Sequence, residues 1–264
     1  MFDAFVVLSS VREKKPLVHH ITNWVTIYDC AQITRACGAL PVMAHAPEEV
    51  EEMVSIAGAL VLNIGTLTRE LVEAMVLAGR KANSLGVPVV LDAVGVGATK
   101  FRNAKSAELL EKVRFTVIKG NSSEIGALAG TKAFTRGVEA EKVEGSLPEI
   151  AGKLAREKNC VVVVTGKEDI VCNGRKTLLV KNGHELMGKI VGTGCMAASV
   201  LGAFNAVEKD SLKASACALA CYGIAGEIAA KKAKTPLKFK TGFFDSFYSL
   251  SEKDLRKAKI GELK

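Results

Sequence analysis

The sequence is poor in the aromatic residues that stack on nucleic-acid bases, with one tryptophan and three tyrosines among 264 residues. Its formal net charge of +8 would otherwise point to a nucleic-acid partner. The basic residues are scattered, however, apart from one lysine cluster within residues 231–240, and no nucleic-acid-binding motif is present. We therefore expect no nucleic-acid partner, and a charge that attracts a polyanionic small substrate.

Metal-like cysteine spacing is also lacking. The seven cysteines are an odd number and stand at none of the spacings typical of zinc sites. This pattern argues against a disulfide framework and against structural zinc. It predicts a reduced, cytoplasmic protein.

Neither a targeting segment nor a long uninterrupted apolar run is visible. Residues 1–11 have no basic start, and the first lysine pair follows the apolar stretch instead of preceding it. The longest apolar region, residues 214–230, is interrupted by Ser215, Tyr222 and Glu227. We expect it to form a buried helix and not a membrane span.

What is present is a regular alternation of short β-branched runs and helical patterns. The expected strands are residues 59–63, 87–92, 115–119 and 160–165, with a hairpin of 169–174 and 176–180. The expected helices are residues 69–84, 104–112 and 121–128, a longer region ending near 157, and most of the last third. Together they predict an α/β fold of three layers, a mostly parallel sheet with helices on both faces. Because no linker or repeat interrupts it, residues 1–264 are expected to form a single domain.

A glycine-rich turn, Gly192-Thr193-Gly194-Cys195, leads into an expected apolar helix over residues 196–207. Such a helix start leaves backbone N–H groups free at the positive end of the helix dipole, where phosphate or a developing oxyanion binds. The same position favours the thiolate form of a cysteine, so Cys195 is a candidate base or nucleophile. The alternative is a tight turn that ends in a buried cysteine.

Two further expected strands end in charged residues. Asp92 ends one of them before a glycine-punctuated loop, and Lys119 ends the next, with Asn121 and Glu124 shortly after. In a parallel sheet, ligands bind beyond the carboxyl ends of the strands. Asp92 and Glu124 are candidate Mg²⁺ ligands, because this cation prefers carboxylate oxygens and retained waters. Lys119 is a candidate phosphate-binding charge.

A third strand ends at Thr165-Gly166, where the hydroxyl of Thr165 could contact a phosphate or a ribose. Each of these residues alone also fits an ordinary role: Asp92 could cap a loop, Glu124 could be an acid at a helix start, and Lys119 could be a surface charge. Their convergence on one sheet edge with the glycine-rich turn favours phosphoryl transfer, where positioning and charge neutralisation provide most of the catalysis.

Six segments together resemble hydroxyethylthiazole kinases, the thiamine-salvage members of the ribokinase-like superfamily, and the similarity extends over about residues 15–250. The Met-Ala-His-Ala-Pro stretch and the Gly-Thr-Gly-Cys turn are its most specific parts. The matching segments are residues 20–23, 40–47, 63–67, 90–99, 120–125 and 192–195.

The resemblance implies a ribokinase-like fold and ATP- and Mg²⁺-dependent phosphorylation of the hydroxyethyl arm of 4-methyl-5-(2-hydroxyethyl)thiazole. It also implies a homotrimer with active sites between subunits. By resemblance, the residues expected to contact the thiazole are Asn23, Met43, Gly192 and Cys195, those expected to contact ATP are Lys119, Asn121, Thr165 and Gly166, and those expected to organise Mg²⁺ are Asp92 and Glu124. Catalysis would depend on residues 192–195, with Cys195 beside the substrate hydroxyl, where most ribokinase-like relatives have aspartate.

Four departures from the family pattern concern the nucleotide side. Ala93 stands where proline is usual, Lys119 where arginine is usual and Val191 where threonine is common, and residues 235–239 replace a Gly-Pro-Gly-containing stretch. A lysine offers a point charge in place of the bidentate fork of arginine, so lower ATP affinity is expected.

Three other functions remain open from the sequence. A kinase for another heterocyclic alcohol, such as a hydroxymethylpyrimidine, would use the same catalytic parts. A cysteine-nucleophile hydrolase built on Cys195 would need a histidine beside the thiol, and His184 is the nearest in sequence. A non-catalytic nucleotide-binding module would have no need of Asp92, Glu124 and Cys195. His19 and His20 are expected to pack or to hydrogen-bond on the substrate side instead of acting in catalysis.

Overall fold

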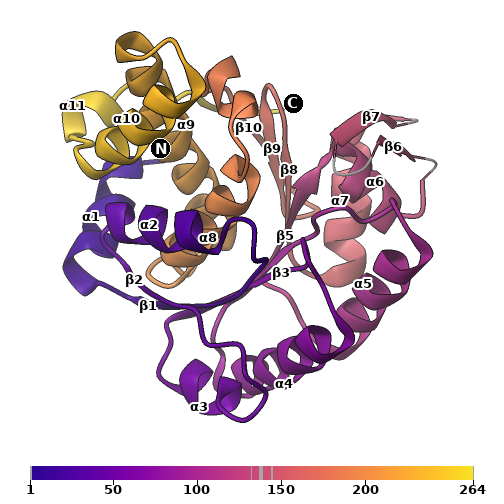
Figure 1. The fold of residues 1–264 in the computed structure, drawn as a ribbon. Coiled ribbons are helices and arrows are strands. Elements are labelled where there is room, and N and C mark those ends of the chain that lie inside the picture. Colours follow the sequence, from indigo (N-terminus) through magenta and orange to yellow (C-terminus); the bar gives the residue numbers. More distant parts are fainter. Residues whose placement is uncertain (1, 132, 137–138, 144, 264) are drawn as a thin grey trace.

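The computed structural model describes residues 2–131, 133–136, 139–143 and 145–263 and is built around one large sheet (Figure 1). In this part of the chain the sheet has nine strands, in the order β11-β10-β9-β8-β5-β4-β3-β1-β2. Neighbours are parallel from β8 to β2, and the β8–β9, β9–β10 and β10–β11 pairs are antiparallel. The strands are β1 (Leu17–Ile21), β2 (Leu40–Val42), β3 (Ala59–Asn63), β4 (Val89–Asp92), β5 (Val117–Asn121), β8 (Val161–Thr165), β9 (Asp169–Cys172), β10 (Thr177–Val180) and β11 (Ile260–Glu262).

Helices cover both faces of this sheet, and each face has its own apolar core (Figure 1). One core is formed with α1 (Ala4–Lys14), α2 (Ile27–Cys37), α8 (Thr193–Asn205), α9 (Ser211–Lys232), α10 (Pro236–Tyr248) and α11 (Glu252–Leu255). The other is formed with α3 (Val50–Ser55), α4 (Arg69–Leu85), α5 (Lys100–Lys112), α6 (Ser122–Leu128) and α7 (Leu147–Lys158). The expected three-layer α/β fold is confirmed.

Alternation along the central strands explains why the β-branched runs of the sequence form this sheet. Successive side chains of a strand point to opposite faces, so a strand covered on both faces must be apolar throughout. In β4, Val90 packs into the first core, whereas Val89 and Leu91 pack into the second. In β8, Val162 and Val164 belong to the second core, and Val161 and Val163 to the first.

Two expected boundaries differ from the observed ones for local reasons. Helix α5 begins at Lys100 and not at 104, because the Thr99 hydroxyl caps it by accepting from the Arg102 N–H. Strand β5 begins two residues later than expected, so Lys119 lies inside the strand and Asn121 ends it. The strands β1 and β2, on the far edge, were not among the expected elements.

The helical region expected to end near residue 157 is α7, which ends at Lys158 and has 12 residues. A two-stranded antiparallel sheet of β6 (Ala133–Arg136) and β7 (Glu139–Val143) precedes α7. Helix α7 begins at Leu147 with Pro148 in its first turn, where a missing N–H costs nothing. A proline at that place marks a helix start, so the helix does not extend further back.

Helix α9, which contains residues 214–230, is long and apolar enough to cross a membrane by length and composition alone. In the folded chain, however, 83% of its most apolar window is buried inside the protein. Its side chains join the first core, and Tyr222 packs edge-on against Phe243 of α10, with ring centres 4.9 Å apart. The expected buried helix is confirmed.

The buried His20 makes the stability of the fold depend on pH. Burial lowers the pKa of His20 from 6.5 to about 4, although its Nδ1 lies 3.0 Å from the Val18 carbonyl oxygen. Below pH 6.5 the unfolded chain therefore binds a proton that the folded chain does not bind until about pH 4. Stability should be fully present above pH 6.5 and should fall as the pH decreases, by about 3 kcal/mol near pH 4.

Chemical denaturation at several pH values measures this loss. His20→Gln should flatten the acid side of the stability curve, and the exposed His184→Gln serves as its control. An acid slope that is the same in all three proteins would contradict the assignment.

Candidate active site

The carboxyl ends of the parallel strands meet at one edge of the sheet, and most residues selected from the sequence lie along it. The start of α8 reaches the middle of this edge, since a Cβ built on Gly194 would lie 3.0 Å from Nζ of Lys119. In sheet order from β8 to β2, the residues at or just beyond the strand ends are Thr165, Asn121, Asp92, Asn63, Asn23 and Met43.

At the centre of this edge is a buried ion pair. Nζ of Lys119 lies 2.9 Å from Oδ1 of Asp92, and the two side chains are 4% and 0% exposed. Burial raises the pKa of Asp92, and the Lys119 ammonium opposes this shift. Burial alone would lower the pKa of Lys119, but the carboxylates of Asp92 and Glu124 outweigh it and raise that pKa. Lys119 is therefore charged, and its charge is directed at Asp92 in this structure.

A row of amides connects the ion pair to the opposite part of the site. The Asn63 Nδ2 donates to Oδ2 of Asp92, and the Asn63 Oδ1 accepts from the Asn23 Nδ2 at 3.0 Å. The same Asn23 nitrogen lies 2.9 Å from the Thr26 hydroxyl and 3.4 Å from the Cys195 sulfur. Asn23, which the sequence assigns to the substrate, and Cys195 are thus brought together.

The turn at residues 192–195 has the geometry expected of a helix start. Gly192 has φ +96°, and a Cβ there would lie 2.7 Å from a Thr26 methyl carbon. Glycine is therefore required both by the backbone conformation and by the lack of space for a side chain. The first helical bond runs from the Met196 N–H to the Gly192 carbonyl at 2.8 Å. The N–H groups of residues 193–195 precede it, at the positive end of α8. The buried Tyr222 fixes this turn by donating to the Thr193 carbonyl at 2.7 Å.

The acidity of Cys195 differs from the expected direction. Burial, followed by the nearby Asp92 carboxylate, raises the pKa of the Cys195 thiol, although Lys119 acts in the opposite sense. A helix start favours thiolate, but here desolvation and a neighbouring negative charge are stronger. The raised pKa favours the neutral thiol of Cys195, against the direction that the helix start alone would give.

Glu124 is placed by backbone contacts. Its two oxygens accept from the Gly95 N–H at 2.8 Å and from the Asn121 N–H at 2.7 Å, and the Asn121 side chain in turn caps α6. Burial raises the pKa of Glu124, and Asp92 contributes in the same direction, so the two carboxylates are near enough to interact. Glu124 thereby holds the loop after β4 beside the end of β5.

The chemistry of these donors fits Mg²⁺ held together with a nucleotide. This cation takes oxygen ligands, retains several waters and commonly uses one or two carboxylates plus substrate phosphates. Asp92 and Glu124 are two buried carboxylates at this edge, and both interact with the charge of Lys119. Within the described residues, no group of three or more histidine, cysteine or acidic side chains could hold a metal ion by itself. Mg²⁺ would therefore need phosphate oxygens and water as further ligands.

At the β8 end of the edge, two residues assigned to ATP make structural contacts. The Thr165 hydroxyl donates to the Gly120 carbonyl at 3.3 Å, which connects β8 to β5. The Gly166 N–H donates to Oδ1 of Asp169 at 3.0 Å and closes the turn into β9. These bonds place Thr165 and Gly166 on the same edge as Lys119.

Residues 8–253 of the chain match the characteristic sequence of the hydroxyethylthiazole kinase family. This chain belongs to the hydroxyethylthiazole kinase family. It is 54% identical over 257 residues to a hydroxyethylthiazole kinase of Methanosarcina acetivorans, covering 97% of this chain and 98% of that protein. It is also 54% identical over 255 residues to a hydroxyethylthiazole kinase of Thermoanaerobacter pseudethanolicus, covering 96% and 97%. The protein is therefore a kinase, as expected.

Solved structures agree with this family and with its fold. The hydroxyethylthiazole kinase of Pyrococcus horikoshii superposes with a TM-score of 0.91 at 45% identity, and all of both chains is covered. A ribokinase-like superfamily protein of Enterococcus faecalis superposes with a TM-score of 0.63 at 13% identity, covering 91% of this chain and 88% of that one. The second likeness shows the fold alone. The expected ribokinase-like fold is confirmed.

Asn63 and Thr26 also lie in the candidate site, although sequence reasoning gave them no role. Asn63 bridges Asp92 and Asn23, and Thr26 packs under Gly192. The signal for Asn63 was available, because it is a polar residue that ends a fully buried strand at this edge, as Asp92 is. Thr26 had no such signal, since its contact depends on how α2 approaches α8.

Met43 lies at the far end of the kinase site, just beyond β2, and is half-buried. The loop after it is fixed by His19, whose Nε2 is 2.7 Å from the Ala44 carbonyl oxygen. On the same loop, His45 packs edge-on against Trp24, with ring centres 4.8 Å apart. The expected packing roles of His19 and His20 agree with these contacts.

Proposed function

We propose that this protein transfers the γ-phosphoryl group of ATP to the hydroxyethyl group of 4-methyl-5-(2-hydroxyethyl)thiazole, with Mg²⁺. The product would be the thiazole phosphate used in thiamine biosynthesis and salvage. The observation that carries the proposal is the buried Asp92–Lys119 pair lying directly against the start of α8, in a chain of the hydroxyethylthiazole kinase family. A buried carboxylate, a lysine ammonium and the N–H groups at the start of α8 are then within reach of one transferring group.

We assign the substrates to opposite parts of the edge. The thiazole would lie near β1 and β2, against Asn23, Met43 and the backbone of Gly192, with Cys195 beside its hydroxyl. ATP would lie near β5 and β8, against Lys119, Asn121, Thr165 and Gly166. The order of these residues along the sheet supports this assignment, because Asp92 and the start of α8 stand between the two groups.

In the proposed reaction, Mg²⁺ held through Asp92 and Glu124 would neutralise phosphate charge. Lys119 would exchange Asp92 for a phosphate oxygen, which a flexible four-carbon stem permits. The N–H groups of residues 193–195 would stabilise the charge that develops on the transferring group. Because phosphoryl transfer has a loose transition state, the accepting hydroxyl needs positioning more than strong deprotonation.

The neutral thiol of Cys195 leads to a prediction about its role. If Cys195 only positions the hydroxyl by hydrogen bonding, a serine hydroxyl can do the same, and Cys195→Ser should keep kcat within about tenfold of the parent. Loss of a proton acceptor would instead lower kcat by about 10²–10⁴-fold. Cys195→Asp should also retain kinase activity, because a carboxylate accepts the same hydrogen bond. Steady-state kinetics over pH 6–9 measures both variants. A loss beyond about a thousandfold in folded Cys195→Ser would contradict positioning and support thiolate chemistry.

The acceptor alcohol is tested by a panel assay with Mg-ATP. We expect kcat/KM for the hydroxyethylthiazole to exceed that for hydroxymethylpyrimidine by at least about a hundredfold. Met43→Ala should reduce this ratio mainly through KM, because Met43 would contact the ring and not the reacting atoms. Preference for the pyrimidine would instead support a kinase for another heterocyclic alcohol.

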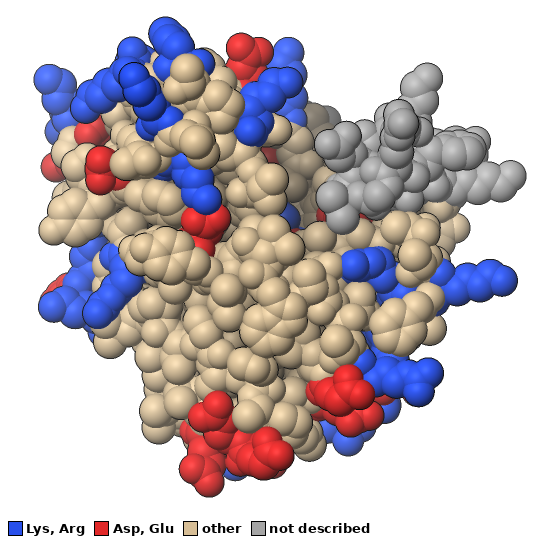
Figure 2. Space-filling model, in the orientation of Figure 1, with Lys and Arg blue, Asp and Glu red and all other residues tan. Residues whose placement is uncertain are grey.

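We also propose one kinase domain that works in the cytoplasm as a homotrimer, with active sites between subunits. Apolar side chains are exposed next to the thiazole end of the site: Trp24 at 50%, Val25 at 68%, Tyr28 at 71% and Val191 at 72%. Figure 2 shows that the middle of this face is largely uncharged, whereas lysines gather above it over α10 and α11. Exposed apolar patches of this kind mark interaction surfaces. Val25→Asp with Tyr28→Glu should give monomers in analytical ultracentrifugation, and an unchanged mass would contradict this interface.

A further inference from the structure

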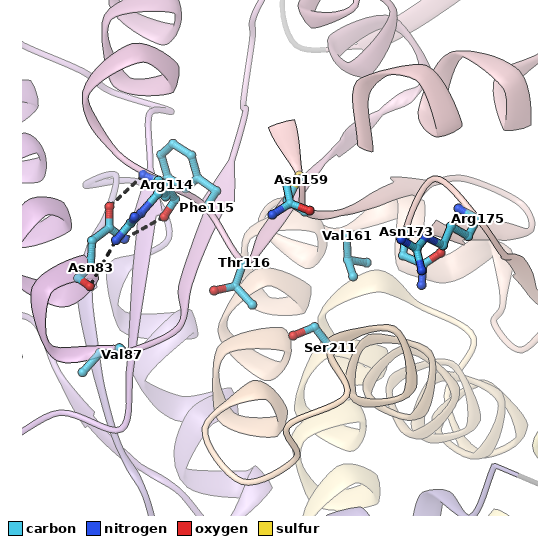
Figure 3. Close-up of a pocket in the computed structure, with 12 residues that line it drawn as sticks. Asn83, Val87, Arg114, Phe115, Thr116, Asn159, Val161, Asn173, Arg175 and Ser211 are labelled. Atoms are coloured by element: carbon cyan, nitrogen blue, oxygen red, sulfur yellow. Dashed lines mark hydrogen bonds between the residues drawn. The ribbon is translucent and has the colours of Figure 1, made fainter. Parts of the chain in front are cut away.

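A cavity lies at the opposite, amino-terminal edge of the sheet, away from the kinase site (Figure 3). It has a volume of about 530 Å³, which is within the usual range for small-molecule sites. It is formed where α4 leads into β4, where β5 and β8 begin, at the β9–β10 turn and at the start of α9. Five separate parts of the fold therefore converge on it.

The polar lining of this cavity is rich in unused hydrogen-bond donors. The Arg175 guanidinium, the Asn159 amide and the Ser211 hydroxyl make no side-chain hydrogen bond within the described residues. The Arg114 guanidinium makes one long bond, 3.4 Å to the Asn83 carbonyl, so most of its donors are unused. Figure 3 shows Arg114 and Arg175 on opposite sides of Asn159 and Thr116.

The charge of the lining is of one sign. It includes two arginines and, among the described residues, no aspartate or glutamate. The acidic residue next to it in the chain is Asp210, whose carboxylate accepts from the Leu212 and Lys213 N–H groups at 3.0 and 3.1 Å and caps α9. The arginines therefore have no carboxylate partner in the cavity, which favours an anionic ligand.

The inner wall of the cavity is apolar. Phe115, Cys160 and Val161 are 6%, 8% and 4% exposed, and Val87 adds a further apolar side chain in the view of Figure 3. An apolar surface beside guanidinium groups suits a ligand with a flat hydrocarbon or heterocyclic body and an acidic substituent. Inorganic anions would use the arginines but not this wall.

We propose that this cavity is a binding site for a small organic anion, an aromatic or heterocyclic ring that carries a phosphate or carboxylate group. The acidic group binds Arg175, Asn159 donates to the ligand, and the ring packs beside Val161, while Arg114 on the far side of the cavity adds positive charge. The site is separate from the kinase site, because β5 runs between them: Thr116 lines the cavity and Asn121 lies at the opposite edge, roughly 17 Å away at the rise of a strand.

Isothermal titration of the full-length protein at constant ionic strength tests this site with three probes: phenyl phosphate, terephthalate and inorganic phosphate. We expect saturable binding of at least one ring-bearing probe, at least about fivefold tighter than inorganic phosphate. The comparison between phenyl phosphate and terephthalate shows whether phosphate or carboxylate is preferred. Arg175→Gln should weaken the better probe at least about tenfold, and Arg114→Gln with Arg175→Gln should weaken it further.

Two matched variants control for location. Arg80→Gln changes an exposed arginine of α4 that does not line the cavity, and Thr165→Val changes the ATP end of the kinase site, so neither should alter binding of the probe. Asn159→Gly removes the amide while tolerating the positive φ of 49° at that residue, and it should weaken binding without unfolding the protein. The proposal is overturned by unchanged affinity in the double arginine variant, by loss of binding in Thr165→Val, by equal affinity for inorganic phosphate, or by no saturable binding up to about 10 mM.

Discussion

Replacing Asp92 by asparagine should lower kcat by a factor on the order of 10³ or more, the largest catalytic loss that any single side chain of this protein should produce. Asp92 is the buried carboxylate on which Lys119 and Asn63 both converge. Asparagine keeps the size of the side chain but removes the negative charge and one of the two oxygens that accept from Lys119 and Asn63. The loss therefore reports on the carboxylate at this position and not on side-chain volume.

Steady-state kinetics over a range of Mg²⁺ concentrations measures the effect of Asp92→Asn. Asp254→Asn, a partly exposed carboxylate on α11, is the matched control and should leave kcat unchanged. Circular dichroism and chemical denaturation establish that the variant is folded. Turnover within about tenfold of the parent at every Mg²⁺ concentration would defeat the assignment of Asp92 to the metal.

Replacing Lys119 by methionine should destabilise the protein by about 3–5 kcal/mol, because it leaves the Asp92 carboxylate buried without its charge partner. The Lys119 side chain is 4% exposed and its ammonium lies 2.9 Å from that carboxylate. Water therefore has little access to the carboxylate and does not compensate for the lost charge. The same change should raise KM for ATP, since the phosphate would lose its cation. Denaturant unfolding and ATP titration measure these two effects independently.

The double variant Asp92→Asn with Lys119→Met separates stability from activity. It contains no buried charge at either position, so it should regain most of the stability lost in Lys119→Met. It should nevertheless remain as inactive as Asp92→Asn alone. A double variant as unstable as the sum of the single ones would show that the pair is not coupled, contrary to the observed contact.

Much of the fold and the identity of the strand ends could be predicted from the sequence because the rules involved are local. A strand buried on both faces must be continuously apolar, which made residues 59–63 and 160–165 evident. Polar residues that end such strands, such as Asp92 and Thr165, then fall at one edge by topology alone. Their assignment to one site needed no knowledge of side-chain contacts.

What could not be predicted depends on contacts between distant parts of the chain. The direction of the Lys119 side chain is set by Asp92, 27 residues earlier, and by the packing of Gly194 against its ammonium. The raised pKa of Cys195 comes from burial and from Asp92, neither of which is visible in the glycine-rich turn. The β6–β7 pair before α7 was missed for a similar reason, since helical periodicity does not specify a short antiparallel pair.

The central claim is that the carboxyl edge of this sheet transfers phosphate from ATP to the thiazole alcohol. Phosphorus NMR of the protein incubated with Mg-ATP and hydroxyethylthiazole tests it most directly. We expect a phosphate monoester signal split by the adjacent CH₂ group, growing in step with ADP and absent with Asp92→Asn. ADP that forms with inorganic phosphate only, or ester that forms equally with Asp92→Asn, would contradict it.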